Sequence, residues 1–99
     1  MSTLNVWMYV IRPVRGGMVD APTDEEAALL REHFAYLQRH RDEGLVRLAG
    51  PSVVPGDTFG IVVLATEDEG IARQTMENDP AVAGGLMRAE LRPFRNAVS

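Results

Sequence analysis

The chain has 99 residues, 45% of them hydrophobic, and a formal net charge of −4, which together predict one domain, 1–99, around a single hydrophobic core. The absence of cysteine excludes disulfides, thiolate nucleophiles and cysteine-based metal sites. With no block of lysine or arginine, and no apolar run longer than the one at residues 6–11 near the start, we expect a cytoplasmic protein that binds neither nucleic acid nor membranes.

A first strand is predicted over residues 4–12, because the run VWMYVI is β-branched and aromatic and Pro13 follows it. Residues 13–22 contain two prolines and a glycine pair, which are typical of a loop. Arg12 and Arg15 flank the start of this loop, and a guanidinium there could hold a substrate carboxylate through two hydrogen bonds. They could equally be solvated or paired with nearby acidic residues.

A helix is predicted to follow Thr23, because Thr23 and Glu26 have the spacing of a capping box and Gly44 suits the left-handed position after a helix end. The residues expected to face the sheet recur at three- and four-residue spacing and are Leu30, His33, Phe34 and Leu37. His33 is therefore expected to point into the core or to its edge.

The second half of the chain repeats this pattern. Two strands are predicted at residues 45–50 and 60–66, joined as a hairpin, followed by a helix within 67–78. The positions of this helix expected to face inward are Ile71, Ala72, Thr75 and Met76. Asp79 and Pro80 should end the helix, residues 81–85 should form a tight linker, and a last strand should end at Pro93 before a tail.

The resulting order, βαββαβ, predicts a ferredoxin-like α+β fold with a four-stranded antiparallel sheet. The first and third strands are apolar on both faces and belong in the centre, so the expected strand order is 4-1-3-2. Right-handed crossovers place both helices on one face. The other face would then leave apolar side chains uncovered, which predicts a homodimer with two sheets packed face to face. The candidates for this face are some of Trp7, Tyr9, Ile11, Ile61 and Val63.

Two stretches, REHFAYLQRHRDEGLVRLAGP and GIVVLATEDEGIARQTMENDPAVAGGLMRAELRPF, together resemble the YCII-related family. The resemblance implies a dimeric α/β barrel and a His–Asp pair in a cleft, which falls on His33 and Asp79. It also implies small-molecule chemistry, including dehydrohalogenation-type elimination. Relatives often have a small hydroxyl residue at the start of the third strand, where this chain has Phe59 and Gly60, with Thr58 nearby.

Two hypotheses from different classes remain. In the first, the chain is a cofactor-free and metal-free lyase or isomerase acting on a small, anionic carboxylic or enolic metabolite, with His33 as general acid or base, Asp79 orienting it, and Arg12 or Arg15 holding the anion. In the second, His33 is a structural core residue and the chain is a dimeric ligand-binding or accessory module. A cofactor-independent oxygenase is a third possibility, which no residue indicates.

Overall fold

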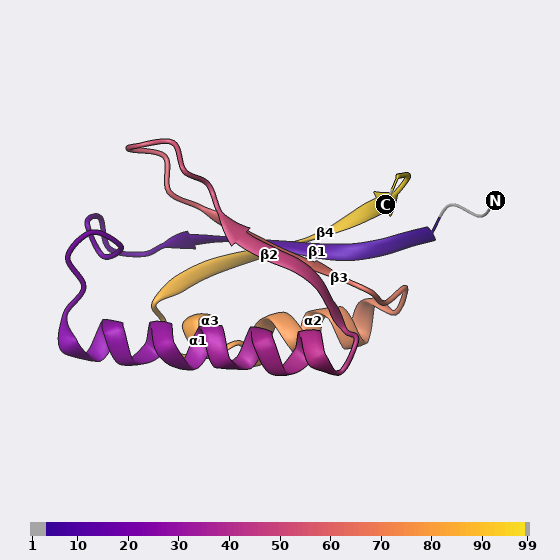
Figure 1. Cartoon of the computed structure of the whole chain (residues 1–99), viewed down its shortest axis with the longest axis horizontal. Coiled ribbons are helices and arrows are strands. Elements are labelled where there is room, and N and C mark those ends of the chain that lie inside the picture. The colour runs from indigo at the N-terminus through magenta and orange to yellow at the C-terminus, as the bar shows by residue number, and fades with distance from the viewer. Residues whose placement is uncertain (1–3, 99) are drawn as a thin grey trace.

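Four antiparallel strands and three helices follow one another in the computed structural model, which describes residues 4–98 (Figure 1). Their bounds in chain order are β1 Leu4–Pro13, α1 Asp24–Asp42, β2 Val46–Pro51, β3 Gly60–Leu64, α2 Glu69–Asn78, α3 Pro80–Ala83 and β4 Met87–Asn96. Within this part of the chain, no helix is both long and apolar enough to cross a membrane.

The sheet has the order β2-β3-β1-β4, which is the predicted 4-1-3-2 order read from the other edge. Both central strands are antiparallel to their neighbours, and Tyr9 of β1 lies opposite Val62 of β3 on one side and Leu91 of β4 on the other. The register between β2 and β3 shifts between Val46 and Leu48. The predicted ferredoxin-like α+β fold is therefore confirmed.

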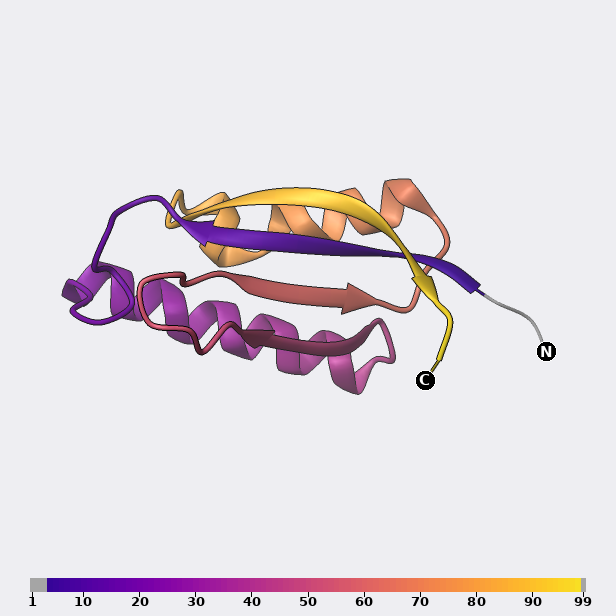
Figure 2. The ribbon, with the colours of Figure 1, turned by 90° about the horizontal axis from the view of Figure 1, so that it is seen from above.

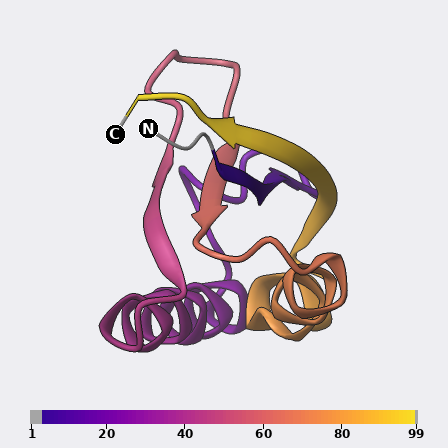
Figure 3. The same ribbon diagram turned by 90° about the vertical axis from the view of Figure 1, so that its right-hand side faces the viewer.

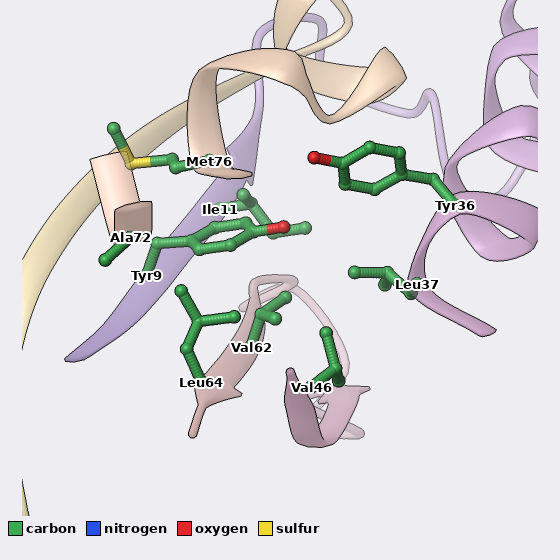
Figure 4. Close-up of a cluster of buried hydrophobic side chains, with 9 residues drawn as sticks. All are labelled: Tyr9, Ile11, Tyr36, Leu37, Val46, Val62, Leu64, Ala72 and Met76. Atoms are coloured by element: carbon green, nitrogen blue, oxygen red, sulfur yellow. The ribbon is translucent and has the colours of Figure 1, made fainter. Parts of the chain in front are cut away.

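All three helices lie on one face of the sheet (Figure 3). Viewed from above, α1 runs alongside β2 and β3, whereas α2 and α3 follow one another beneath β1 and β4 (Figure 2). The core between helices and sheet is shown in Figure 4 and consists of Tyr9, Ile11, Tyr36, Leu37, Val46, Val62, Leu64, Ala72 and Met76. Because side chains alternate along a strand, this core takes every second residue of β1 and β3.

Helix α1 begins and ends as its sequence predicts. The Thr23 hydroxyl accepts a hydrogen bond from the Glu26 backbone, while the Glu26 carboxylate accepts one from the Thr23 backbone at 2.9 Å. Gly44, with φ of 86°, follows the helix end. The predicted inward face is correct for His33 and Leu37, which are buried, whereas Phe34 is 54% exposed at the edge of that face. Tyr36, which was not predicted to face inward, is buried. Successive residues are 100° apart around a helix, so Tyr36, three residues after His33, lies closer to His33 around the helix axis than Phe34 does.

Helix α2 differs from prediction at Ile71, which is 47% exposed, because the buried side of this helix is formed by Ala72, Thr75 and Met76 and Ile71 lies beside it. The expected linker after Asp79 contains the short helix α3, since Asp79 caps it and Pro80 has the φ of a first helical residue. Strand β4 continues through Pro93 instead of ending there. Pro93 lies opposite Trp7, and β4 tolerates it because β4 is an edge strand.

The face of the sheet away from the helices carries both apolar and charged side chains. Alternation assigns the candidates for this face: Ile61 and Val63 lie on it, whereas Trp7, Tyr9 and Ile11 belong to the helix-covered side. Its other apolar members are Met8 and Val10, together with Leu48 and Phe94, which are 55% and 38% exposed. We call this surface the open face.

Candidate active site

His33 lies on the side of α1 that faces the sheet, and only 5% of its side chain is exposed. The capping box fixes where α1 starts, and the buried neighbours Tyr36 and Leu37 fix how the helix is rotated. Together they direct the imidazole toward the junction of α2 and α3. The histidine is thus placed by the packing of one helix face.

Asp79 lies at that junction and is fully buried. Its backbone is extended, with φ of −60° and ψ of 124°, because a residue before proline avoids the helical region. Its side chain caps α3 by accepting a hydrogen bond from the backbone N–H of Ala81 at 3.0 Å. Gly84 at the end of α3 allows close packing on α1, since a Cβ there would lie 2.7 Å from Leu29.

The two side chains meet. His33 Nδ1 lies 2.7 Å from Asp79 Oδ1, and the Tyr9 hydroxyl donates to Asp79 Oδ2, also at 2.7 Å. Burial raises the pKa of Tyr9, and the negative charge of Asp79 raises it further, so Tyr9 remains a donor. The Asp79 carboxylate accepts from Tyr9, from the Ala81 backbone and from the imidazole, and this last contact orients His33 with its proton on Nδ1. Nε2 is then the free basic nitrogen.

A cavity of about 500 Å³ opens beside His33, between α1, β2, β3 and the loops that flank them. Most of its wall is aliphatic, including Ile11, Leu30, Leu37, Val46, Val62 and Met87, and two aromatic rings, Phe34 and Phe59, complete the apolar surface. Its polar side chains are His33, Gln38, Arg41 and Thr58. Since Nδ1 of His33 is held by Asp79, Nε2 is the nitrogen available to a molecule in this cavity.

The two arginines predicted to bind substrate lie outside this cavity. Arg12 is on the open face, where it stacks over the Phe59 ring at 5.0 Å and lies 3.8 Å from Asp57. Arg15 makes two hydrogen bonds to Glu26, at 2.9 and 2.6 Å, and so ties the loop to the start of α1. Neither lines the cavity, and a role for them in binding an anion stays a prediction.

Two polar residues around the site, Arg41 and Tyr9, were not singled out as site residues from the sequence, and a third, Thr58, was noted only as a hydroxyl near the start of the third strand. Arg41 continues the stripe of Leu30, His33 and Leu37 at the next four-residue step, so helical spacing could have identified it. Tyr9 carried no such signal, because β1 is apolar on both faces. Thr58, expected only as a possible substitute hydroxyl, lines the same cavity as His33.

Across residues 4–98, no group of three or more histidine, aspartate or glutamate side chains is arranged to hold a metal ion. His40, the second histidine of the chain, contacts Glu43 at 3.0 Å and packs against the Tyr36 ring.

The fold and the buried pair define a ferredoxin-like α+β protein with a histidine and an aspartate beside an open cavity. The YCII-related domain model matches residues 7–95, and the chain belongs to this family. No curated protein sequence matches it. Among solved structures, the chain is similar to 5-chloro-2-hydroxyhydroquinone dehydrochlorinase (TftG) from Burkholderia phenoliruptrix AC1100, in complex with 2,5-dihydroxybenzoquinone.

That enzyme is 22% identical in sequence; the match covers 89% of this chain and 92% of that one, with a TM-score of 0.61. A second similar structure is the uncharacterized protein TM1266 from Thermotoga maritima, at 12% identity, with 94% and 99% of the two chains covered and a TM-score of 0.46. The first likeness supports the fold assigned above.

Proposed function

We propose that the chain is a cofactor-free enzyme of the lyase or isomerase type, in which His33 moves a proton on a small carboxylic or enolic molecule. The observation that carries this proposal is the 2.7 Å contact between His33 and a fully buried Asp79 at the wall of a cavity. A core histidine that served packing alone would not need an ionisable partner and an open space on its other side.

In the proposed reaction, Nε2 of His33 accepts a proton from a carbon next to a carbonyl or enol group. The electron pair of that C–H bond then forms a new double bond. In an elimination the pair displaces a leaving group such as chloride, and in an isomerisation the imidazolium returns the proton to another carbon. Asp79 stabilises the imidazolium that forms in between.

The cavity wall supports a substrate that is small and largely apolar. Arg41 is the arginine among the lining residues, and we assign it the carboxylate or enolate oxygen of the substrate, although its guanidinium also contacts Asp42 at 3.2 Å. Arg15 does not line the cavity and is held by Glu26. The dehydrochlorinase of similar fold was solved with a dihydroxybenzoquinone. Chlorinated hydroquinones and small enolic acids are therefore the first compounds to test.

The decisive variant is His33→Asn, because the asparagine amide can replace Nδ1–H as donor to Asp79 while removing the base. We expect His33→Asn to fold normally and to lose at least about 100-fold in turnover of any compound that the wild type converts. The matched control is His40→Asn, which should retain full turnover. Retained turnover in His33→Asn would contradict the proposal.

If the tested compounds bind to the protein but are not converted, the alternative of a non-catalytic binding module is favoured. Thermal shift measures this, since a ligand stabilises the folded chain according to its excess over its dissociation constant. If wild type and His33→Asn bind the same compounds equally well and neither converts them, His33 serves binding or packing only.

We further propose that the protein is a homodimer joined through the open face. Leu48 and Phe94 expose apolar side chains there, beside the half-buried Met8, Val10 and Ile61. An apolar surface of this kind commonly marks a protein interface. Sedimentation at micromolar concentration should give the mass of a dimer, and a monomer alone would refute it.

A further inference from the structure

The hydroxyl of Tyr9 is a polar group in the core, and packing alone does not explain its presence there. The ring lies among aliphatic side chains, with its hydroxyl on the side that faces α1 (Figure 4). A phenylalanine would fill the same volume, and a buried hydroxyl is tolerated only where it has a partner. The partner here is Asp79 Oδ2 at 2.7 Å, and both residues are fully buried.

We propose that Tyr9 is a positioning residue, which holds the Asp79 carboxylate in place and thereby sets how tightly His33 keeps a proton. The inference rests on the proposed function of His33 as the base. Tyr9 touches no substrate in this scheme, because it does not line the cavity, and it acts on His33 through Asp79 alone.

The hydrogen bonds of Asp79 explain how Tyr9 fixes its orientation. Oδ1 accepts from His33 Nδ1 and from the Ala81 backbone, whereas Oδ2 accepts from Tyr9. Donors on both oxygens fix the plane of the carboxylate. Without the Tyr9 hydroxyl, Oδ2 would be buried without this donor, and the plane would be held from one side only.

The same hydrogen bond has an electrostatic consequence. A donor on Oδ2 draws negative charge away from Oδ1, so the carboxylate attracts the imidazolium of His33 less strongly. Removing the hydroxyl should make Asp79 a better partner for charged His33. His33 should then keep its proton to higher pH.

Few other polar groups bear on the pair. Tyr36 of α1 is near Asp79, but its hydroxyl donates to the Thr75 carbonyl at 2.8 Å and so does not bind the carboxylate. Arg41, also on α1, lines the same cavity as His33 and contacts Asp42 at 3.2 Å. From β1, Tyr9 is the titratable residue that contacts Asp79, which makes Tyr36 the natural control.

The experiment is a ¹⁵N NMR titration of the histidine side chains of the full chain, which contains two histidines and two tyrosines. In Tyr9→Phe, we expect the midpoint of the His33 titration to rise by about half to one pH unit, with the proton of the neutral ring still on Nδ1. In Tyr36→Phe, the midpoint should stay within about 0.2 unit of the wild type. A Tyr9→Phe midpoint equal to the wild type would overturn the proposal.

If Tyr9→Phe does not fold, fluorotyrosine gives a second measurement. In the Tyr36→Phe background Tyr9 is the remaining tyrosine, and 3-fluorotyrosine there is a stronger donor, so the His33 midpoint should fall instead of rise. A rise or no change would overturn the proposal. Neither titration needs a substrate, so a failed turnover screen would count against the proposed function and leave the role of Tyr9 to be judged by NMR alone.

Discussion

The two faces of the sheet differ in how they treat polar groups. On the helix-covered face, Tyr9 and Asp79 are fully buried and each hydroxyl or carboxylate oxygen has a partner. On the open face, Arg92 pairs with Glu90 in solvent, and Arg12 lies beside Arg88 on the neighbouring strand. One face thus holds its charges in a fixed geometry, and the other keeps them exposed.

The difference between the two faces matches the roles proposed for them, proton transfer on the helix-covered face and dimer formation on the open face. Burial strengthens the Tyr9–Asp79–His33 hydrogen bonds, because the local dielectric constant is low, and this suits proton transfer. The open face combines apolar strand residues with solvated charges, which suits contact with a second copy. The same strand, β1, serves both faces through alternate residues.

The largest expected effect is that of Asp79→Ala, which removes the acceptor from the buried face. Tyr9, His33 and Ala81 would then lack the carboxylate that accepts their hydrogen bonds. The free energy of unfolding should therefore fall by about 3–5 kcal/mol. Asp68→Ala is the matched control, because Asp68 caps α2 in solvent and should cost only about 1 kcal/mol. Urea denaturation measures both, and equal losses would show that Asp79 is an ordinary cap.

Gly84→Ala should have the next largest effect, because it separates the two helices that carry the pair. The new Cβ would lie 2.7 Å from a Leu29 methyl group and 2.8 Å from the Pro80 carbonyl oxygen. We expect a loss of about 1–3 kcal/mol in unfolding free energy. The control is Gly16→Ala, where nothing lies within 4 Å and the change should stay within about 0.5 kcal/mol. If Gly84→Ala leaves the free energy of unfolding unchanged, α3 can move away from α1 without a loss of stability.

Val10→Lys tests the open face with little expected effect on the protomer itself. Val10 lies opposite Glu90, so a lysine gains a partner of opposite charge within the sheet, while it places a charge in the proposed interface. We expect a folded monomer by circular dichroism and sedimentation. Gln74→Lys on the exposed side of α2 should leave the oligomeric state unchanged. A dimeric Val10→Lys would place the interface elsewhere.

The smallest effect is expected at the loop that Arg15 ties to α1. The hydrogen bonds from Arg15, and next that from the Thr23 backbone, lower the pKa of Glu26 from 4.5 to about 2. Because this pKa is lower in the folded state, its contribution to stability is present above pH 4.5 and is lost as the pH falls toward 2. The difference in unfolding free energy between wild type and Glu26→Gln should therefore shrink over this range.

An Arg15→Met background checks the cause. It should remove most of that pH dependence, since it removes the main donor to Glu26. A difference between wild type and Glu26→Gln that stays constant from pH 4.5 to 2 would contradict the assignment.

The ends of the helices were predicted well, because they depend on residues that are close together in the sequence. The capping box of Thr23 and Glu26 fixed the start of α1, and Asp79 before Pro80 fixed the end of α2. The α3 turn and the passage of β4 through Pro93 were missed. Both depend on the surrounding structure. The α3 turn forms because Asp79 caps a new helix, and β4 passes through Pro93 because an edge strand does not need the N–H group that proline lacks.

Three features could be predicted from the sequence: the order of the elements, the central place of β1 and β3, and the inward direction of His33. Each follows from the spacing of apolar residues along one segment. Only the tertiary structure decided which face of β1 meets the helices, since both faces are apolar. It also decided that Tyr9 reaches Asp79 and that Arg41, not Arg12 or Arg15, lines the cavity. These contacts join residues as far as 70 positions apart, and only packing brings such residues together.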